Sequence, residues 1–361
     1  MSAEYRRTFE PTLLNMPKSL QVKTINLALQ GGGSHGAFTW GVLDRLLEEN
    51  KQLQIEGISG TSAGAMNGAA LLQGYCMNGA QGARDALDNF WTSIGDMNSF
   101  DLPQRTMINQ MLGNWWQTDF NPAALMLDAM QHMFSPYQMN PFNFNPLRTL
   151  LNKMLDINAI RSCGSVKLFV CATNVETGRV RVFDQKDISI DALLASGCLP
   201  FTFQAVKIDD VPYWDGGYVG NPSLFPLIYG CDSPDIAVVQ INPLIRKGIP
   251  ETPSEIINRV NEISFNASLI SEMRAIAFVQ HLIDEDHLKN EEAARLKRMN
   301  IHEINAEDKL RVLGAASKMN CSMDFLLSLK EIGRATAEQW MKENWDAIGD
   351  HSSIDIRETY L

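Results

Sequence analysis

The sequence predicts an α/β fold with a mainly parallel sheet. A buried strand over Lys23 to Leu29 is followed by three glycines and by a helical pattern from Ala37 to Glu48. A second short strand, Ile55 to Ser59, leads in the same way into a small-residue helix over Ser62 to Tyr75. Two consecutive strand–turn–helix units imply crossover helices, which connect parallel strands of one sheet.

Further strand patterns extend this sheet through the chain. They cover Val166 to Ala172, Arg179 to Phe183, Phe203 to Ile208 and Ile236 to Ile241. The last run is continuously apolar, as is typical of a central parallel strand. No change of composition resembling a linker interrupts residues 23–348, so we expect a single domain between an N-terminal arm (1–22) and a C-terminal tail (349–361).

The second half is expected to be increasingly helical. Within a helical C-terminal region, residues 254–348, the pattern predicts a helix from Ser254 to about Met299, a strand over Met299 to Asn305 and a closing amphipathic helix over Met323 to Ile348. Residues 96–146 are instead rich in Met and aromatic side chains and show no clear period. They form either a cap over a site, with an adaptable apolar surface, or an irregular part of the core.

Composition and charge limit the partners. The chain has 361 residues, 45% of them hydrophobic, and a formal net charge of -11. That balance disfavours nucleic acid and supplies no polybasic anchor for anionic lipid. The six cysteines have no metal-like spacing and no calcium-loop motif is present, so we expect reduced thiols and neither metal nor other cofactor.

Targeting signals are not evident in the sequence. The N-terminus lacks an apolar segment followed by a small-residue cleavage site, and no apolar run approaches the roughly 20 residues of a membrane span. We therefore expect a cytoplasmic protein, with peripheral contact at the inner membrane surface left open. The oligomeric state is not predicted.

The second strand–turn–helix unit carries a nucleophile motif. Gly60-Thr61-Ser62-Ala63-Gly64 matches G-x-S-x-G, in which the serine occupies a sharp turn between a strand and a helix. The flanking Gly60 and Gly64 fit this turn because its strained backbone needs small neighbours. The pattern favours Ser62 as a nucleophile over a chance match in a small-residue turn.

The glycine loop after the first strand has two interpretations. Its G-x-G-x-x-G pattern, with Gly31, Gly33 and Gly36, fits a dinucleotide phosphate at a helix N-terminus. A nucleotide site would need an acidic residue at the end of the second strand. Glu56 lies at the start of that strand, and the elbow of Ser62 occupies its end.

The alternative is an oxyanion hole, which the nearby elbow favours. The N–H groups of Gly31, Gly32 and Gly33 could face a tetrahedral oxyanion, together with the N–H group of Ala63, which follows the nucleophile. A helix starting near Ser34 would add the positive end of its dipole.

A base for Ser62 is expected at Asp215, which Gly216 and Gly217 follow. Asp-Gly alone is most often a turn, but near a serine elbow and a glycine loop we interpret Asp215 as the base. No histidine lies in a pattern that marks a triad base. Since His281 and His287 follow in the order Ser, Asp, His, a Ser-His-Asp triad remains an alternative mechanism.

Four segments in this order resemble the bacterial patatin-like phospholipases: QGGGSHGAFTWGVL, GISGTSAGAMNG, ASGCLPFTF and YWDGGYVGNP. The resemblance covers roughly residues 23 to 243. It implies a three-layer α/β/α sandwich and a Ser-Asp dyad without histidine. It maps the oxyanion loop onto Gly31 to Gly36, the nucleophile onto Ser62 and the aspartate onto Asp215, while the segment Ser196 to Phe201 would shape the site.

The resulting expectation is a serine acyl hydrolase that acts on phospholipids or other lipid esters. Burial would raise the pKa of Asp215 from about 3.9 and make it a better base at neutral pH. Two other classes stay open: a non-catalytic lipid-binding or regulatory protein on the same fold, and a nucleotide-binding protein.

Overall fold

The computed structural model describes residues 22–49, 51–100, 134–285 and 296–361. The predicted N-terminal arm, except Val22, and most of the Met- and aromatic-rich segment 96–146 lie outside these ranges. The interpretation of that segment as a cap therefore stays a prediction.

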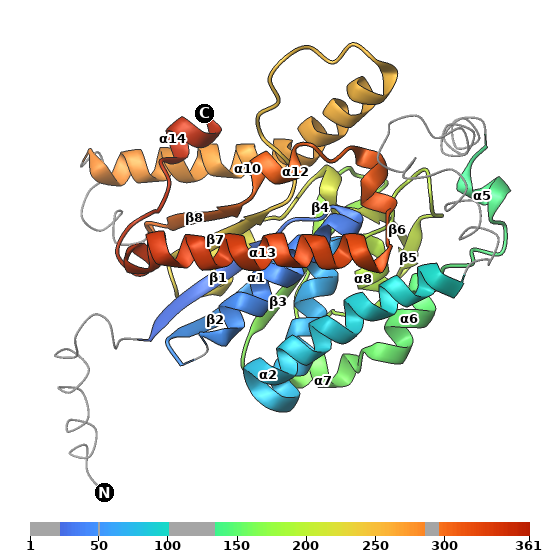
Figure 1. Cartoon of the computed structure of the whole chain (residues 1–361), viewed down its shortest axis with the longest axis horizontal. Helices are drawn as coiled ribbons and strands as arrows, with labels where there is room; N and C mark the ends of the chain where they lie inside the picture. Colours follow the sequence, from blue (N-terminus) through green and yellow to red (C-terminus); the bar gives the residue numbers. More distant parts are fainter. Residues whose placement is uncertain (1–21, 50, 101–133, 286–295) are drawn as a thin grey trace, which may run out of the picture.

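The strands of the described residues form one mainly parallel sheet, as the sequence predicts (Figure 1). Its order is β5-β6-β3-β2-β1-β7-β8, with β4 also paired to β3. The pairs from β3 through β2, β1 and β7 to β8 are parallel, whereas β4, β5 and β6 form antiparallel pairs. The strands are β1 (Lys23–Leu29), β2 (Leu53–Thr61), β3 (Lys167–Asn174), β4 (Val180–Phe183), β5 (Val206–Ile208), β6 (Val211–Asp215), β7 (Asp235–Gln240) and β8 (Asn300–Asn305).

Helices cover both faces of the sheet. The α-helices are α1 (Gly36–Glu48), α2 (Ala63–Phe100), α5 (Pro136–Met139), α6 (Pro146–Met154), α7 (Ile157–Ser162), α8 (Ile190–Ser196), α9 (Phe225–Gly230), α10 (Pro253–Asp284), α12 (Glu307–Leu310), α13 (Met323–Asn344) and α14 (Ile356–Tyr360). Short 3₁₀ turns are η2 (Gly33–His35), η4 (Gly216–Tyr218), η5 (Ala315–Met319) and η6 (Trp345–Ala347).

Two apolar cores lie on opposite sides of the sheet, which gives the three layers expected. Successive side chains of a strand point to opposite faces. In β1, Leu27 and Leu29 accordingly join the core formed with α1, α2 and α13, whereas Ala28 joins the core formed with α9, α10 and α14. Figure 1 shows α13 lying across α1, and their backbones approach closely where Gly41 meets the carbonyl of Lys330.

Helix α2 is longer than the predicted helix over Ser62 to Tyr75. Its backbone leaves the helical conformation at Asn78 and at Gly79, whose φ is 59°. The chain then resumes a helix that ends at Phe100. The predicted part corresponds to the segment before this kink.

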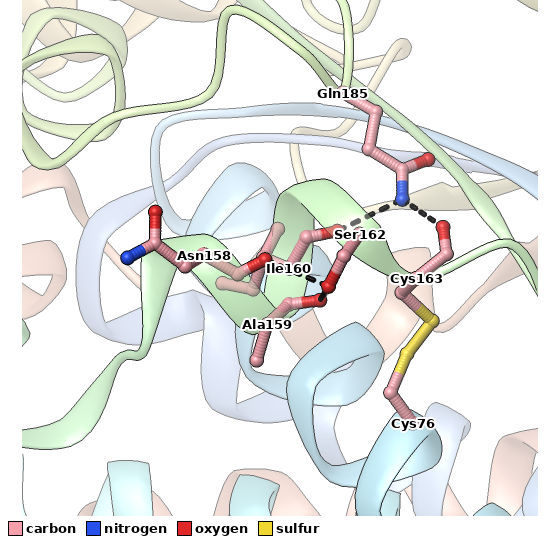
Figure 2. Close-up of a disulfide and its surroundings, with 7 residues drawn as sticks. All are labelled: Cys76, Asn158, Ala159, Ile160, Ser162, Cys163 and Gln185. Carbon is pink, nitrogen blue, oxygen red and sulfur yellow. Dashed lines mark hydrogen bonds between the residues drawn. A yellow bond between two sulfur atoms is a disulfide. The ribbon is translucent and has the colours of Figure 1, made fainter.

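A disulfide between Cys76 and Cys163 corrects the expectation that all six cysteines are reduced (Figure 2). It joins α2, just before the kink, to the end of α7, and the two Cα atoms are 6.0 Å apart. That separation is within the usual range for a disulfide. Sequence spacing could not reveal the pair because 87 positions separate the two residues. The other cysteines, Cys171, Cys198, Cys231 and Cys321, are free.

The C-terminal segment 349–361, expected as a tail, packs against the fold. It contains α14, in which Ile356 and Tyr360 are buried in the core next to α10. The predicted strand near Asn300 and the predicted closing helix near Met323 are confirmed as β8 and α13.

Candidate active site

The site lies at the carboxyl ends of three neighbouring parallel strands. β1 is central, with β2 on one side and β7 on the other. The glycine loop follows β1, the serine elbow follows β2, and Asn242 follows β7 by two residues. Ligand sites in such sheets occur where successive strands are placed on opposite sides of an earlier one.

Ser62 occupies a strained turn between β2 and α2. Its φ of 54° is unusual for a residue with a side chain. The neighbouring glycines are needed for close packing, since a Cβ at Gly60 would lie 2.6 Å from the carbonyl oxygen of Gly64. A Cβ at Gly64 would collide with the carbonyl of Leu29 in β1. The sequence therefore forms the sharp strand-to-helix turn that its G-x-S-x-G motif predicts.

The glycine loop lies directly against this elbow. A Cβ at Gly31 would lie 2.7 Å from the Cβ of Ser62, so only glycine allows this approach. The N–H group of Gly31, however, donates to Oδ1 of Asn221 at 2.6 Å. This bond corrects the expectation that Gly31 supplies an oxyanion donor, because its hydrogen is already used.

Three other N–H groups of the glycine loop and the serine elbow remain available. Within the described ranges, the N–H groups of Gly32, Gly33 and Ala63 have no hydrogen-bond acceptor. Gly33 begins the 3₁₀ turn that leads into α1, and Ala63 begins α2. The N-termini of α1 and α2 approach each other here, since a Cβ at Gly36 would lie 2.6 Å from the Cβ of Ala63. Two helix N-termini thus favour negative charge at this place.

Asp215 ends β6 and is only 1% exposed. Its Oδ1 accepts the N–H group of Gly217 at 2.7 Å, and its own N–H group donates to the carbonyl of Cys198 at 2.8 Å. Burial raises the pKa of Asp215 to about 7, against the lowering effects of the Gly217 N–H group, the Ser62 hydroxyl and the charge of Lys318. The Ser62 hydroxyl thus lies near enough to this carboxyl group to influence its pKa.

The strand registers explain why Ser62 and Asp215 come together. Thr61, the last residue of β2, pairs with Cys171 of β3, and Asp215, the last residue of β6, pairs with Ala172. Gly216 then packs against the carbonyl of Cys171, where a Cβ would collide. Asp215 is thus not part of a two-residue hairpin turn, which was the alternative interpretation of Asp-Gly.

Several supporting residues could not be identified from sequence. Oγ of the buried Ser196 accepts the N–H group of Ser62 at 2.8 Å. The hydroxyl of Thr61 donates to the carbonyl of Gly220 at 2.6 Å. Ser196 lies in the segment expected to shape the site, and Asn221 in the motif around Asp215, but nothing in their spacing specifies these contacts.

The described histidines have partners other than Ser62 and Asp215. Nε2 of His35 is 2.8 Å from Oγ of Ser317, and burial lowers the pKa of His35 to about 3. His281 pairs with Glu285 at 3.2 Å, and His302 lies 2.9 Å from Asp235. His351 pairs with its neighbour Asp350. His132 and His287 lie outside the described residues.

Glu56 does not face the glycine loop. Its carboxylate accepts the N–H groups of Asp232 and Ser233, at 2.7 and 2.8 Å, near the amino end of β7. Lys167 also bonds to it at 3.0 Å. Glu56 is therefore not placed to bind a ribose, as a dinucleotide site at the glycine loop would require.

The described part of the chain contains neither a metal-binding cluster nor a membrane-spanning helix. No cluster of three or more His, Cys, Asp or Glu side chains there is arranged to hold a metal ion. No helix in the same ranges is long and apolar enough to cross a bilayer.

Fold and site together define a mixed α/β protein with a serine elbow at the carboxyl edge of a mainly parallel sheet. Residues 27–228 match the family model described as patatin-like phospholipase, which covers more than half of the sequence. The chain therefore belongs to the patatin-like phospholipase family.

The chain is also similar to solved structures, of which VipD is one example. The crystal structure of VipD from Legionella pneumophila is 17% identical, with a TM-score of 0.37, and the match covers 85% of this chain. It covers 66% of the VipD chain, slightly under two thirds. No curated protein matches the sequence.

Proposed function

We propose that the protein hydrolyses fatty-acyl ester bonds of phospholipids or related lipids through an acyl-Ser62 intermediate, with Asp215 as the base. The observation that carries this proposal is a serine in a strained turn near a buried carboxyl group whose pKa is raised to about 7. A group with a pKa near the working pH is suited to both accept and return a proton.

In the first half of the reaction, Oγ of Ser62 attacks the carbonyl carbon of the ester while its proton passes to Asp215. The carbonyl oxygen becomes an oxyanion, which the N–H groups of Gly32, Gly33 and Ala63 stabilise. The tetrahedral intermediate then collapses to acyl-Ser62, and the C–O bond to the alcohol breaks. Asp215 returns the proton to the departing alcohol oxygen.

In the second half, a water molecule attacks the acyl-Ser62 carbonyl carbon and gives a proton to Asp215. The same N–H groups stabilise the second oxyanion. Collapse of this intermediate breaks the bond between the acyl group and Oγ of Ser62, to which Asp215 returns the proton. The fatty acid leaves and the free serine is restored.

Hydrolysis of a chromogenic fatty-acyl ester tests the nucleophile. Ser62→Ala should lose turnover and covalent labelling by a fluorophosphonate, whereas Ser162→Ala, a change of an exposed serine, should keep both. Turnover in Ser62→Ala would overturn the proposal. A wild-type protein that binds lipid but is neither labelled nor active would instead be a non-catalytic lipid-binding protein.

Substitution of Asp215 and of the histidines separates the dyad from a Ser-His-Asp triad. Asp215→Asn should lower kcat by about 100- to 10,000-fold, the range for removal of a general base. His281→Ala and His287→Ala should remain active. A folded but inactive histidine variant would favour the triad.

The ester class can be determined by lipid-product profiling. Incubation of the enzyme with a mixed membrane extract should release fatty acids and lysophospholipids, and the Ser62→Ala protein should release neither. If products come only from neutral lipids or acyl thioesters, the hydrolase mechanism stands but the phospholipid assignment is wrong.

A further inference from the structure

Residues 317–321, which lie outside the family match in and just after η5, pack against the glycine loop. Oγ of Ser317 lies 2.8 Å from Nε2 of His35, and Sγ of Cys321 lies 3.2 Å from Oγ of Ser34. The Lys318 carbonyl sits against Gly33, where a Cβ would collide. Residues 317–321 therefore hold the loop in place although they lie far beyond position 228, where the family match ends.

Lys318 also reaches the loop through Asn242. Its Nζ donates to Oδ1 of Asn242 at 2.7 Å, and Nδ2 of Asn242 donates to the carbonyl of Gly31 at 2.9 Å. Asn242 is 1% exposed, so its amide has no bulk water as an alternative partner. A lysine ammonium group can only donate, so its bond to Oδ1 keeps the amide NH₂ directed at Gly31.

The Gly31 carbonyl and the Gly32 N–H group belong to one peptide unit. In a trans peptide these two groups point in opposite directions. A bond that fixes the Gly31 carbonyl toward Asn242 therefore fixes the Gly32 N–H group away from Asn242. The bond from the Gly31 N–H group to Asn221 restrains the neighbouring peptide unit.

We propose that Lys318 is a positioning residue, which acts through Asn242 to aim the Gly32 N–H group at the oxyanion. This inference rests on the proposed function, since it assigns the N–H group a role in the same reaction. Among the described residues, the side chain of Lys318 hydrogen-bonds to Asn242 and not to Ser62 or Asp215.

An electrostatic effect must be separated from positioning. Lys318 faces Asp215 of β6 and Glu262 of α10, His35 lies within reach of its charge, and its Nζ is 5.5 Å from the centre of the Phe265 ring. Burial lowers the pKa of Lys318 to about 8. Removing its positive charge would raise the pKa of Asp215, which could lower activity at neutral pH without any change in the loop.

Measurement at about pH 9 distinguishes the two effects, since this pH lies above the pKa values of Asp215 and Lys318, about 7 and about 8. Asp215 is then ionised, and a neutral lysine amine can still donate to Asn242. Lys318→Met should lower kcat for the acyl ester about 10- to 100-fold at this pH, less than the 100- to 1,000-fold typical of deleting an oxyanion donor. KM should change little, because the oxyanion forms only in the reaction.

Lys297→Met is the matched control. Lys297 is also partly buried and donates to the carbonyls of Cys231 and Ser233, at 2.7 and 3.0 Å, near the amino end of β7 and away from Ser62. It should keep wild-type kcat. A Lys318→Met protein with normal kcat at pH 9, reduced only at lower pH, would overturn positioning in favour of a charge effect on Asp215.

Asn242→Asp provides a second variant. Its carboxylate keeps an acceptor for Lys318 but cannot donate to the Gly31 carbonyl. The proposal expects a loss of kcat similar to that of Lys318→Met, and full kcat in folded Asn242→Asp would contradict it.

Amide hydrogen exchange tests, without any measurement of turnover, whether Lys318 restrains the glycine loop. The peptide that contains Gly31 to Gly33 should exchange faster in Lys318→Met than in wild type or Lys297→Met. Unchanged exchange would overturn the proposal even if the wild-type protein proved inactive. Faster exchange together with an inactive wild-type protein would support the restraint of the glycine loop by Lys318 and refute the proposed hydrolase function.

Discussion

The protonation of Asp215 determines the pH range in which the proposed reaction can proceed. Its carboxyl group must be ionised to accept the Ser62 proton, and burial raises its pKa to about 7. We expect kcat/KM to rise through pH 7 and reach a plateau above it. A pH–rate profile checks this, and an acidic limb centred near pH 4, the value of an exposed aspartate, would show that the carboxyl group is not shielded.

Because of the same burial, the ionised form of Asp215 should lower the free energy of unfolding. A raised pKa in the folded state contributes stability below the unfolded-state value, 3.8, and that contribution is lost as pH rises through about 7. At pH 8 the loss is up to about 4 kcal/mol for a shift of this size. Asp215→Asn should therefore have a higher Tm than wild type at pH 8, and a smaller advantage at pH 4. Calorimetry at both pH values measures the difference.

Sequence could predict the residues of the site that carry a local motif. Ser62 and its glycines follow from the elbow, and Asp215 from its position at a strand end before two glycines. Lys318 and Asn242 could not be found, because Lys318 binds a residue 76 positions away, Asn242 binds one 211 positions away, and neither sits in a distinctive pattern. The N–H group of Gly31 was misassigned because its acceptor, Asn221, is likewise visible only in the folded chain.

At the scale of elements, the disulfide between Cys76 and Cys163 holds α2 and α7 together. Neither cysteine belongs to the candidate site of Ser62 and Asp215. A cross-link that closes a loop of this size stabilises a fold by about 2–4 kcal/mol. Cys76→Ser should lower Tm and leave kcat unchanged. Thermal unfolding with and without reductant checks the stability effect, which should disappear in the variant.

Peptide mapping under non-reducing conditions provides the control for this pair. It should link the peptides of Cys76 and Cys163 and leave Cys171 unmodified by any cross-link. Free thiols at all six positions would restore the original expectation. Disulfides are commonest in oxidising compartments, so this bond and the predicted cytoplasmic location favour different environments.

The pattern of apolar residues predicted most strands and the helices with a clear period. The expected strands near Lys23, Val166 and Ile236 are confirmed. The part of α2 after Gly79 was not anticipated, because a glycine at positive φ ends the first helix and the Ala- and Gly-rich sequence gives only a weak apolar period. The helix α8, which supplies Ser196, was also missed, since seven residues provide too short a pattern.

At the scale of the whole molecule, Asp235 joins the sheet edge to the C-terminal segment. Its Oδ1 lies 2.9 Å from Nε2 of His302 in β8 and accepts the N–H group of Gly349 at 2.9 Å. Asp235→Ala would leave the buried His302 ring and the Gly349 N–H group without this acceptor, and we expect a loss of about 3–5 kcal/mol in the free energy of unfolding. Urea denaturation measures it. The exposed Asp350→Ala, a neighbouring change, should have a much smaller effect.

Strand β3 determines the relative positions of Ser62 and Asp215, because β2 and β6 both pair with it in fixed registers. Because Thr61 and Asp215 pair with consecutive residues of β3, the alignment of two separate strands sets the separation of Ser62 and Asp215, the proposed nucleophile and base. A slip of β6 by one residue would move Asp215 by about 3.3 Å and turn its side chain to the other face of the sheet. A misaligned sheet could keep both cores largely buried and still be inactive, so hydrolysis would report the correct pairing of strands as sensitively as it reports the serine.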